Sequence, residues 1–178
     1  MPFWNQSNFD PKRQFKFKVV FDSVKAGVSP TQYYLAQMAD RPKWTVSDGT
    51  KIDFLDKTFH YPGKVSWDPV TITFIDGATG NDNMARAAYR YLSNAGWVSP
   101  EGMVAGVNPA EFATISKGGA TSSNNVTVQA LKADGTIAES YVLYNSFITN
   151  VDLDGFDYKG EGILTAKFKF RFDYAEIE

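Results

Sequence analysis

A chain of 178 residues, 43% hydrophobic and 21% charged, has the composition of an ordinary soluble globular protein and is long enough for one domain with a core. It contains no cysteine, which excludes disulfides, thiol nucleophiles and thiolate metal sites. Its formal charge of −2 lacks the basic excess that would hold nucleic acid through phosphate contacts. We expect a single domain over residues 1–178, without a secretion signal or a membrane-spanning segment.

The first predicted strand lies in the segment Arg13 to Phe21, where apolar and polar residues alternate strictly. Phe15, Phe17, Val19 and Phe21 share one parity, opposed by Gln14, Lys16 and Lys18. Successive side chains of a strand point to opposite faces, so the pattern predicts a half-buried strand.

A hairpin is predicted next, from two extended segments that flank a turn. Lys43 to Val46 and Lys51 to His60 lie on either side of Ser47-Asp48-Gly49. Pro62-Gly63 then breaks the pattern, and the alternating residues from Val70 to Phe74 predict a further strand.

One amphipathic helix is predicted after this strand. Met84, Ala87, Ala88, Tyr91 and Leu92 recur at helical spacing, preceded by the cap candidates Asn81 and Asp82 and closed by Asn94 to Gly96. A second, short helix is predicted near Asn108, where Pro109 suits a first helical position.

The rest of the chain returns to strands. They are predicted over Val126 to Lys132, Thr136 to Tyr144, Phe147 to Leu153 and Ile163 to Glu176, with a turn at Asp134-Gly135. In the last of them, Phe168, Phe170, Phe172 and Tyr174 oppose Lys167, Lys169, Arg171 and Asp173. The small-residue stretch Lys117 to Asn125 is expected to be a mobile loop. The fold class is mainly β, of the α+β type, with one flanking helix.

Catalytic and metal-binding signals are weak. His60 is the one histidine and lies beside aromatic residues, and no serine stands in a G-x-S-x-G motif, so we expect no enzyme and no cofactor. The turns Asp76 to Asn83 and Asp152 to Asp157 carry oxygen ligands but lack the calcium-loop pattern, and turns favour these residue types in any case. We therefore expect no metal site.

Assembly is the function that the residues themselves suggest. Strands with an aromatic face need another sheet to cover it, and exposed strand edges pair with further chains. Arg86 and Arg90 lie one helical turn apart and could contact an anion or a partner carboxylate; a solvated face is the alternative.

The order of segments resembles the tail tube proteins of contractile-tailed bacteriophages, a family similar to the inner-tube proteins of contractile bacteriocins and type VI secretion. The resemblance covers most of the chain and is strongest over residues 43–97 and 160–175. It is carried by FKFKVVF, by YPGKVSWDPVTITFID leading into NDNMARAAYRYLSNAG, and by GILTAKFKFRFDYAE. No short motif defines these tubes, and the glycine- and serine-rich part of residues 98–125 matches weakly.

The resemblance implies a β-sandwich or barrel subunit that lends strands to a shared barrel in a hexameric ring. Rings would stack into a hollow tube inside a sheath, in a virion tail assembled in the host cytoplasm. The implied partners are further copies of the chain, the sheath, baseplate and tail terminator proteins, a tape measure protein in the lumen, and double-stranded DNA that passes without specific binding.

Two hypotheses concern residues of such a tube. A bore that passes DNA without holding it should not be lined with lysine. We therefore expect Asp53 and Asp56 to face the lumen, and the basic residues Lys16, Lys18, Lys167, Lys169 and Arg171 to point away from it. The segment Ser47 to Lys64, with Asp48, Gly49, Pro62 and Gly63, is expected to form a loop that contacts the next ring.

Three alternatives stay open. A tube-initiating baseplate protein or a secretion-system tube would share the fold. A monomeric β-barrel that binds an apolar ligand would use the same alternation, with its aromatic rings facing a cavity.

Overall fold

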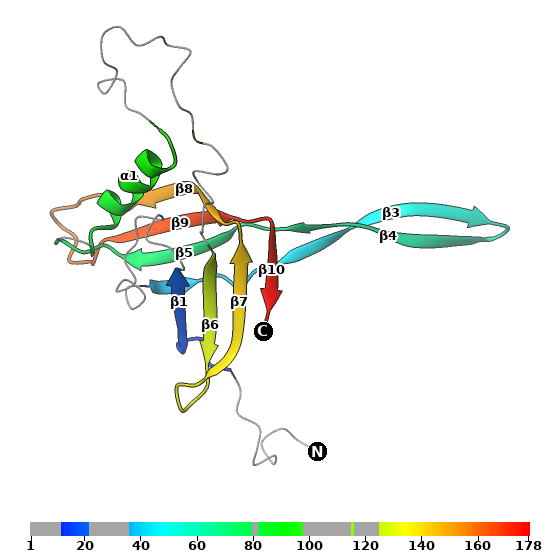
Figure 1. Cartoon of the computed structure of the whole chain (residues 1–178), viewed down its shortest axis with the longest axis horizontal. Coiled ribbons are helices and arrows are strands. Elements are labelled where there is room, and N and C mark those ends of the chain that lie inside the picture. Colours follow the sequence, from blue (N-terminus) through cyan, green and yellow to red (C-terminus); the bar gives the residue numbers. More distant parts are fainter. Residues whose placement is uncertain (1–11, 22–35, 80–81, 98–114, 116–124) are drawn as a thin grey trace, which may run out of the picture.

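The computed structural model describes residues 12–21, 36–79, 82–97, 115 and 125–178, which form ten strands and one helix (Figure 1). In chain order these are β1 (Phe17–Phe21), β2 (Ala36–Ala39), β3 (Trp44–Phe54), β4 (Lys57–Trp67), β5 (Val70–Ile75), α1 (Met84–Asn94), β6 (Val126–Leu131), β7 (Ile137–Tyr144), β8 (Phe147–Leu153), β9 (Thr165–Arg171) and β10 (Tyr174–Ile177). Among the described residues, no helix has the length and apolar character needed to cross a membrane.

The strands form two four-stranded sheets and a separate hairpin. Sheet A has the order β1-β6-β7-β10, and sheet B has the order β2-β5-β9-β8. Every neighbouring pair in both sheets is antiparallel. The hairpin of β3 and β4 extends far from the body and is called the arm here (Figure 1). The predicted mainly β fold with one helix is confirmed.

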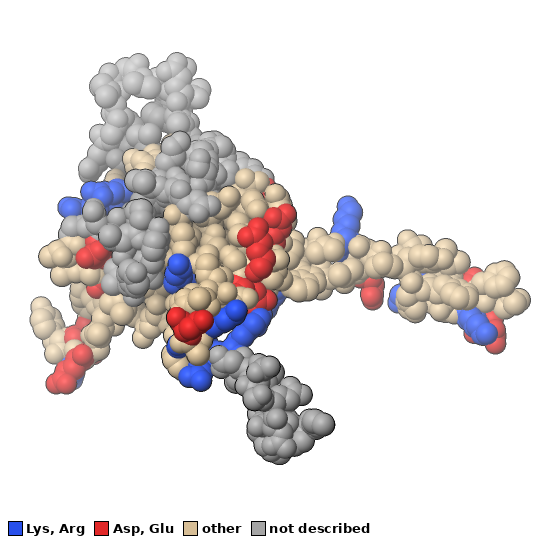
Figure 2. Space-filling model, turned by 60° about the horizontal axis from the view of Figure 1, so that its bottom comes forward, with Lys and Arg blue, Asp and Glu red and all other residues tan. Residues whose placement is uncertain are grey.

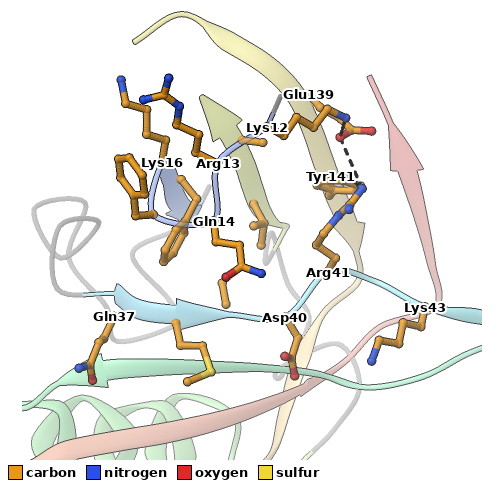
Figure 3. Close-up of a pocket in the computed structure, with 16 residues that line it drawn as sticks. Lys12, Arg13, Gln14, Lys16, Gln37, Asp40, Arg41, Lys43, Glu139 and Tyr141 are labelled. Carbon is orange, nitrogen blue, oxygen red and sulfur yellow. Dashed lines mark hydrogen bonds and ion pairs between the residues drawn. The ribbon is translucent and has the colours of Figure 1, made fainter. Parts of the chain in front are cut away.

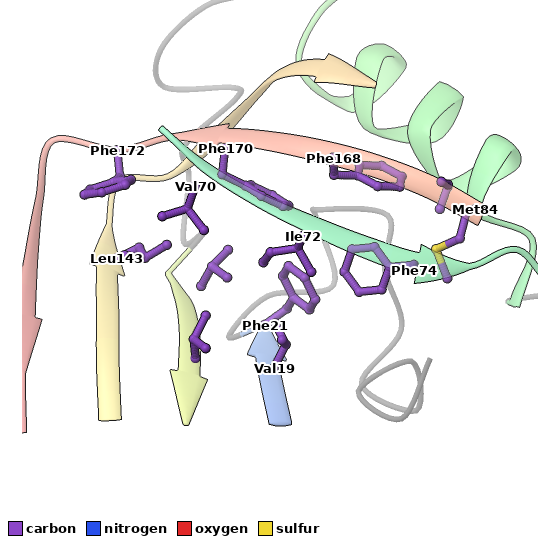
Figure 4. Packing of buried hydrophobic residues seen from close by; sticks show 14 of the residues in the cluster. Val19, Phe21, Val70, Ile72, Phe74, Met84, Leu143, Phe168, Phe170 and Phe172 are labelled. Carbon is purple, nitrogen blue, oxygen red and sulfur yellow. The ribbon is translucent and has the colours of Figure 1, made fainter. Parts of the chain in front are cut away.

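The core lies between the two sheets, where the apolar faces of alternating strands meet (Figure 4). Phe21 of sheet A packs against Phe74 and Phe170 of sheet B, with ring centroids 5.9 and 6.0 Å apart. Phe74 also contacts Phe168 edge to face at 5.5 Å. Each buried Phe side chain contributes about 1.5–3 kcal/mol relative to an exposed one, and these rings pack on one another instead of facing a ligand.

The alternation at the end of the chain is confirmed, but its interpretation as one strand is wrong. Phe168, Phe170 and Phe172 are buried, as predicted. Strand β9 nevertheless ends in sheet B before Phe172, and β10 begins in sheet A at Tyr174, so the chain crosses between the sheets. Tyr174 therefore leaves the core and stacks on Tyr144 at a centroid distance of 4.7 Å.

The first strand is shorter than predicted. It begins at Phe17, and Phe15 is 72% exposed, although Val19 and Phe21 are buried on the expected face. The strands predicted from Val70, Val126, Thr136 and Phe147 are confirmed within a residue or two. Gly135 has a φ of 86° in the predicted turn after β6. The helix predicted near Asn108 and residues 117–124 of the predicted loop lie outside the described residues.

Helix α1 is confirmed, with a different cap. The N-cap is Asn83, not Asn81 or Asp82, and its side-chain oxygen accepts the N–H of Arg86 at 2.7 Å. Asp76 accepts the N–H of Met84 at 2.7 Å and thus satisfies another donor of the first turn. The helix ends at the predicted place, where Gly96 has a φ of 107°.

The predicted turn of the hairpin is wrong. Strand β3 continues through Ser47-Asp48-Gly49 to Phe54, and the chain turns at Leu55 and Asp56, where Leu55 has a φ of 57°. Asp48 instead pairs with Pro62 in a stretch of irregular register. A Cβ on Gly49 would lie 2.2 Å from the Tyr61 carbonyl oxygen, so this glycine permits close approach of two strands.

Candidate assembly surfaces

The arm exposes large apolar side chains that nothing among the described residues covers along most of its length. All of β3 is exposed, as is β4 up to Trp67. Trp44, Val46 and Val65 lie near the base, and Ile52, Phe54, Phe59 and Tyr61 lie toward the tip, each between 46% and 66% exposed. Two register shifts lie between these groups and interrupt the alternation of the strands. A two-stranded hairpin is marginal by itself in water, and a large exposed apolar patch marks an interaction site. Figure 2 shows the arm projecting from the body with scattered charges of both signs.

Aromatic contacts join the arm to the body. Trp67 packs on Trp44 at a centroid distance of 5.4 Å and on the buried Phe172 at 5.9 Å. The base of the arm is therefore tied to the core, while its tip extends into solvent.

The edges of the two sheets differ. In sheet B, the edge strand β8 is bonded to the helix, because the Ile148 N–H donates to the Tyr91 hydroxyl at 3.0 Å. The other edge, β2, has four residues and an irregular register between Ala36 and Met38. Short or bulged edge strands and covered edges resist further pairing. The edge strands of sheet A, β1 and β10, are also short, with five and four residues, so strand length does not separate the two sheets. The covered β8 edge makes sheet A the better candidate for pairing with another chain.

The two edge strands of sheet A carry opposite charge. The segment from Lys12 to Phe21, which includes β1, holds Lys12, Arg13, Lys16 and Lys18 and no acidic residue. The segment from Asp173 to Glu178, which includes β10, holds Asp173, Glu176 and Glu178 and no basic residue. A second copy could therefore meet the first with opposite charges facing each other.

The residues predicted to face the lumen lie together at the tip of the arm. Asp53 is paired with Thr58 across the hairpin and accepts its hydroxyl at 2.6 Å, and Asp56 lies in the turn itself. Their lumen-facing role stays a prediction.

The residues predicted to contact the next ring lie within the arm. Asp48, Gly49, Pro62 and Gly63 meet across the hairpin in its irregular stretch, not at a loop tip. Arg86 and Arg90 lie on the exposed side of α1, separate from the arm. The partner-contacting roles of both groups stay predictions.

The basic residues expected to avoid the bore divide between two faces. Lys18 lies on the outer face of sheet A, since its neighbour Val19 points into the core. Lys167, Lys169 and Arg171 are exposed on the outer face of sheet B, opposite Phe168 and Phe170. The five therefore cannot all turn away from a bore lined by the outer face of either sheet.

Carboxylates of the predicted acidic turn Asp152 to Asp157 accept hydrogen bonds from nearby residues of the chain. Asp154 accepts both the N–H and the hydroxyl of Thr165, and these bonds hold the pKa of that carboxyl below its usual value. Asp157 accepts the N–H of Lys159 at 3.0 Å. Within the described ranges, no group of three or more His, Asp or Glu residues could hold a metal ion. His60 is exposed and pairs with Lys51 on the arm.

A groove of about 620 Å³, which the sequence did not predict, lies where β1 approaches β2 (Figure 3). Its charged side chains interact: Lys12 forms an ion pair with Glu139, and Arg41 lies 3.6 Å from the same carboxylate. Arg41 also bonds to the Tyr141 hydroxyl, with its guanidinium 5.1 Å from the ring centroid. The Lys12 ammonium lowers the pKa of Glu139, and burial raises the pKa of Tyr141.

Comparison with known proteins identifies the fold. No family model matches the chain, and no curated protein matches it in sequence. A chain from the extended sheath-tube complex of the extracellular contractile injection system PVC is 12% identical, covering 94% of this chain and 91% of that one, with a TM-score of 0.56. In the 6-fold symmetrised baseplate of the anti-feeding prophage, a chain is 8% identical, covering 97% of both chains, with a TM-score of 0.56. In the tube terminating cap of that prophage, a chain is 14% identical, covering 98% of this chain and 95% of that one, with a TM-score of 0.57.

This chain has the fold of contractile injection system proteins. The resemblance given above from the sequence is therefore confirmed at the level of the fold. The neighbours come from sheath-tube, baseplate and cap assemblies.

Proposed function

We propose that this protein is the subunit of the inner tube of a contractile tail, and that it assembles through sheet A into hexameric rings that stack. The observation that carries the proposal is the pair of oppositely charged edge strands that bound one sheet, in a fold shared with chains of 6-fold and sheath-tube assemblies. In sheet B, in contrast, the edge strand β8 is bonded to α1 and the edge strand β2 has an irregular register.

The strand directions suit a closed ring. Sheet A has four strands that alternate in direction, so β1 and β10 run antiparallel to each other. When β10 of one copy pairs with β1 of the next, the alternation continues around the ring without a parallel pair. Six four-stranded sheets exceed the roughly 16–18 strands at which porin barrels already enclose water. Closure also removes the exposed edges of every copy.

In this ring, the outer face of sheet A lines the bore, because its other face packs on sheet B. Lys18, Gln129 and Ser140 form one row across this face, and Val20, Thr127, Val142 and Glu176 form the next. Lys18 is thus accompanied by Glu176 and Glu178. The bore has no basic excess, which suits the passage of DNA during ejection without retention.

The remaining parts of the function follow from the same fold. The outer face of sheet B, with Lys167, Lys169 and Arg171, points to the sheath. Baseplate and terminator proteins meet the two ends of the tube, and a tape measure protein occupies the lumen before DNA does. The assembled tube belongs to a virion tail, put together in the host cytoplasm.

Electron microscopy of the purified protein tests the proposal, because rings or tubes would be visible directly. The double substitution Glu176→Lys and Glu178→Lys places lysines opposite the basic β1 edge, and we expect it to abolish ring formation. Adding Lys18→Glu restores opposite charges and should restore rings in part. Lys169→Glu, on the outer face of sheet B, is the control and should leave assembly intact. A wild-type protein that stays monomeric at all concentrations would refute the proposal.

A further inference from the structure

One edge of sheet A presents alternate residues of β1 to a further strand. The Lys16 carbonyl accepts the N–H of Leu131 at 2.9 Å, so residues with the parity of Lys16 bond to β6. In an antiparallel sheet the backbone groups of successive residues point to opposite sides of the strand. Those of Phe17 and Val19 therefore point out of the sheet, where a strand of another copy can bond to them.

The opposite edge presents alternate residues of β10 in the same way. Ser140 and Glu178 exchange two backbone hydrogen bonds, at 2.8 and 2.9 Å, so residues with the parity of Glu178 bond to β7. The backbone groups of Ala175 and Ile177 therefore point outward. A junction between two copies must join residues that point outward on both strands, so its register can change only in steps of two residues.

The register within one copy has no stagger, meaning no shift along the strands from one strand to the next. Val20, Thr127, Val142 and Glu176 lie directly opposite one another across the four strands. A closed barrel requires a stagger, because its strands tilt by about 35–45° from the barrel axis. Four strands about 4.8 Å apart span roughly 19 Å, and at this tilt the register must shift by about 4–6 residues per copy. This shift must therefore arise at the junction between copies.

The short edge strands leave one choice for this shift. Without a stagger, Glu178 would lie opposite Lys18 of the next copy, because these residues end one row of the sheet. A shift of four residues toward the start of β1 puts Tyr174 opposite Lys18. A shift of six in that direction carries β10 past the start of β1 at Phe17, and a shift of four in the other direction carries it past the end at Phe21.

We propose that β10 of one copy pairs with β1 of the next with a stagger of four residues, so that Tyr174 lies opposite Lys18 and Ile177 lies opposite Phe15. This inference rests on the proposed function, since it specifies the register of the contact that closes the ring.

The stagger gives two exposed apolar side chains a partner. Ile177 is 48% exposed, although Ala175, which has the same parity, packs against the core. Phe15 is 72% exposed where it lines the groove beside β1. The Cβ atoms of directly opposite residues lie about 4.5–5.5 Å apart, so these two side chains cover each other. On the outer face, Glu176 becomes a diagonal neighbour of Lys18, which keeps unlike charges close.

The absence of cysteine allows the register to be measured by disulfide formation. Lys18→Cys is combined in turn with Tyr174→Cys, Glu176→Cys and Glu178→Cys, which report staggers of four, two and zero residues. Within one chain, β1 and β10 lie three strand spacings apart, on the order of 14 Å, which is too far for a disulfide inside one copy.

Each double variant is assembled, checked for rings by electron microscopy, oxidised and run on a denaturing gel without reductant. We expect the Tyr174 variant to give a ladder of up to six linked copies, and the Glu176 and Glu178 variants to give none. The single variant Lys18→Cys is the control and should stay unlinked. Phe15→Cys with Ile177→Cys leaves every charge of both edges in place and should give the same ladder as the Tyr174 variant.

The outcomes separate the stagger from the proposed function. A ladder from the Glu176 or Glu178 variant instead of the Tyr174 variant would overturn the stagger and leave the ring standing. Rings that form without a ladder from any of the four pairs would overturn the pairing of β10 with β1, and the stagger with it. Wild-type protein that forms neither rings nor tubes would overturn the proposed function itself.

Discussion

The bond between helix α1 and the edge of sheet B gives the sharpest test of how the fold limits its own pairing. Tyr91 is 4% exposed, and its hydroxyl accepts the N–H of Ile148 on strand β8 at 3.0 Å. Tyr91→Phe keeps the ring that packs near Ala95 and Phe147 but removes the acceptor. A buried N–H without a partner costs about 1–3 kcal/mol. The urea concentration at the midpoint of unfolding should therefore decrease by an amount between a few tenths of a molar and about 1 M.

The assay is urea unfolding followed by tryptophan fluorescence, together with hydrogen exchange at single residues. The Ile148 amide should exchange faster in the Tyr91→Phe variant than in the wild type. Tyr89→Phe is the control, because Tyr89 is 56% exposed, and its stability should stay within about 0.5 kcal/mol of the wild type. Equal stability of the two variants, with an unchanged Ile148 amide, would refute the view that this hydroxyl holds the helix to the edge.

The same bond predicts a pH dependence. Burial raises the pKa of Tyr91 above its ordinary value of 10.0, although the bond from Ile148 acts in the opposite direction. The folded protein therefore favours the neutral hydroxyl. Its contribution to the free energy of unfolding is complete below pH 10 and is lost as the pH rises through the raised pKa. The advantage of the wild type over Tyr91→Phe should shrink only above pH 10.

Three further predictions concern packing, strand approach and acid sensitivity. Phe168→Ala removes a fully buried ring and should lower the free energy of unfolding by about 3–5 kcal/mol, measured by chemical denaturation. Gly49→Ala places a Cβ 2.2 Å from the Tyr61 carbonyl oxygen, so the arm should distort. Electron microscopy should then show no stacked tubes, while the circular dichroism spectrum of the protein stays close to that of the wild type. Asp154→Asn weakens the hydrogen bonds to Thr165 and should lower the thermal midpoint of unfolding. The pKa of Asp154 is lowered from 3.8 in the folded protein. The difference in thermal midpoint from the wild type should therefore be present above pH 4 and vanish as the pH falls through the lowered pKa.

Period-two alternation predicted the core residues well, because a residue's parity decides its face in a strand without register shifts. Phe168, Phe170 and Phe172 are buried whichever sheet the backbone has reached. Parity contains no signal for a change of sheet, however. The alternation of aromatic and charged residues continues through Phe172 and Asp173, where the chain crosses between the sheets. Tyr174 has the same parity as the buried phenylalanines, so the sequence predicted one long strand.

The arm shows why turn residues misled the prediction. Gly49 and Gly63 are typical of turns, yet both lie inside the hairpin, where a Cβ would meet the opposite strand. The real turn uses Leu55 in a left-handed conformation, which a bulky residue rarely adopts. The turn preference of glycine therefore predicted the turn at the wrong residues. These glycines are present because the two strands approach closely there.

The groove could not be found from the sequence, because its residues come from four separate parts of the chain, one of which holds Val128 and Ala130. Lys12 to Phe17, Gln37 to Lys43 and the pair Glu139 and Tyr141 meet only after both sheets have formed. Each segment alone resembles a solvated face. Their convergence depends on β1 and β2 lying at neighbouring edges, which alternation does not specify.

In the assembly proposed above, the difference between the edges of the two sheets limits growth to a ring. If both sheets kept long, unprotected edges, copies could add through either one and form irregular aggregates. Here α1 covers the β8 edge of sheet B and the β2 edge is irregular in register, which leaves one basic and one acidic edge on sheet A. A contact between unlike edges is heterologous, so it either closes into a ring or extends as a filament. With lateral pairing assigned to sheet A, contact between rings falls to other exposed apolar surface, of which the described residues offer the arm and the segment that holds Phe156, Tyr158 and Ile163.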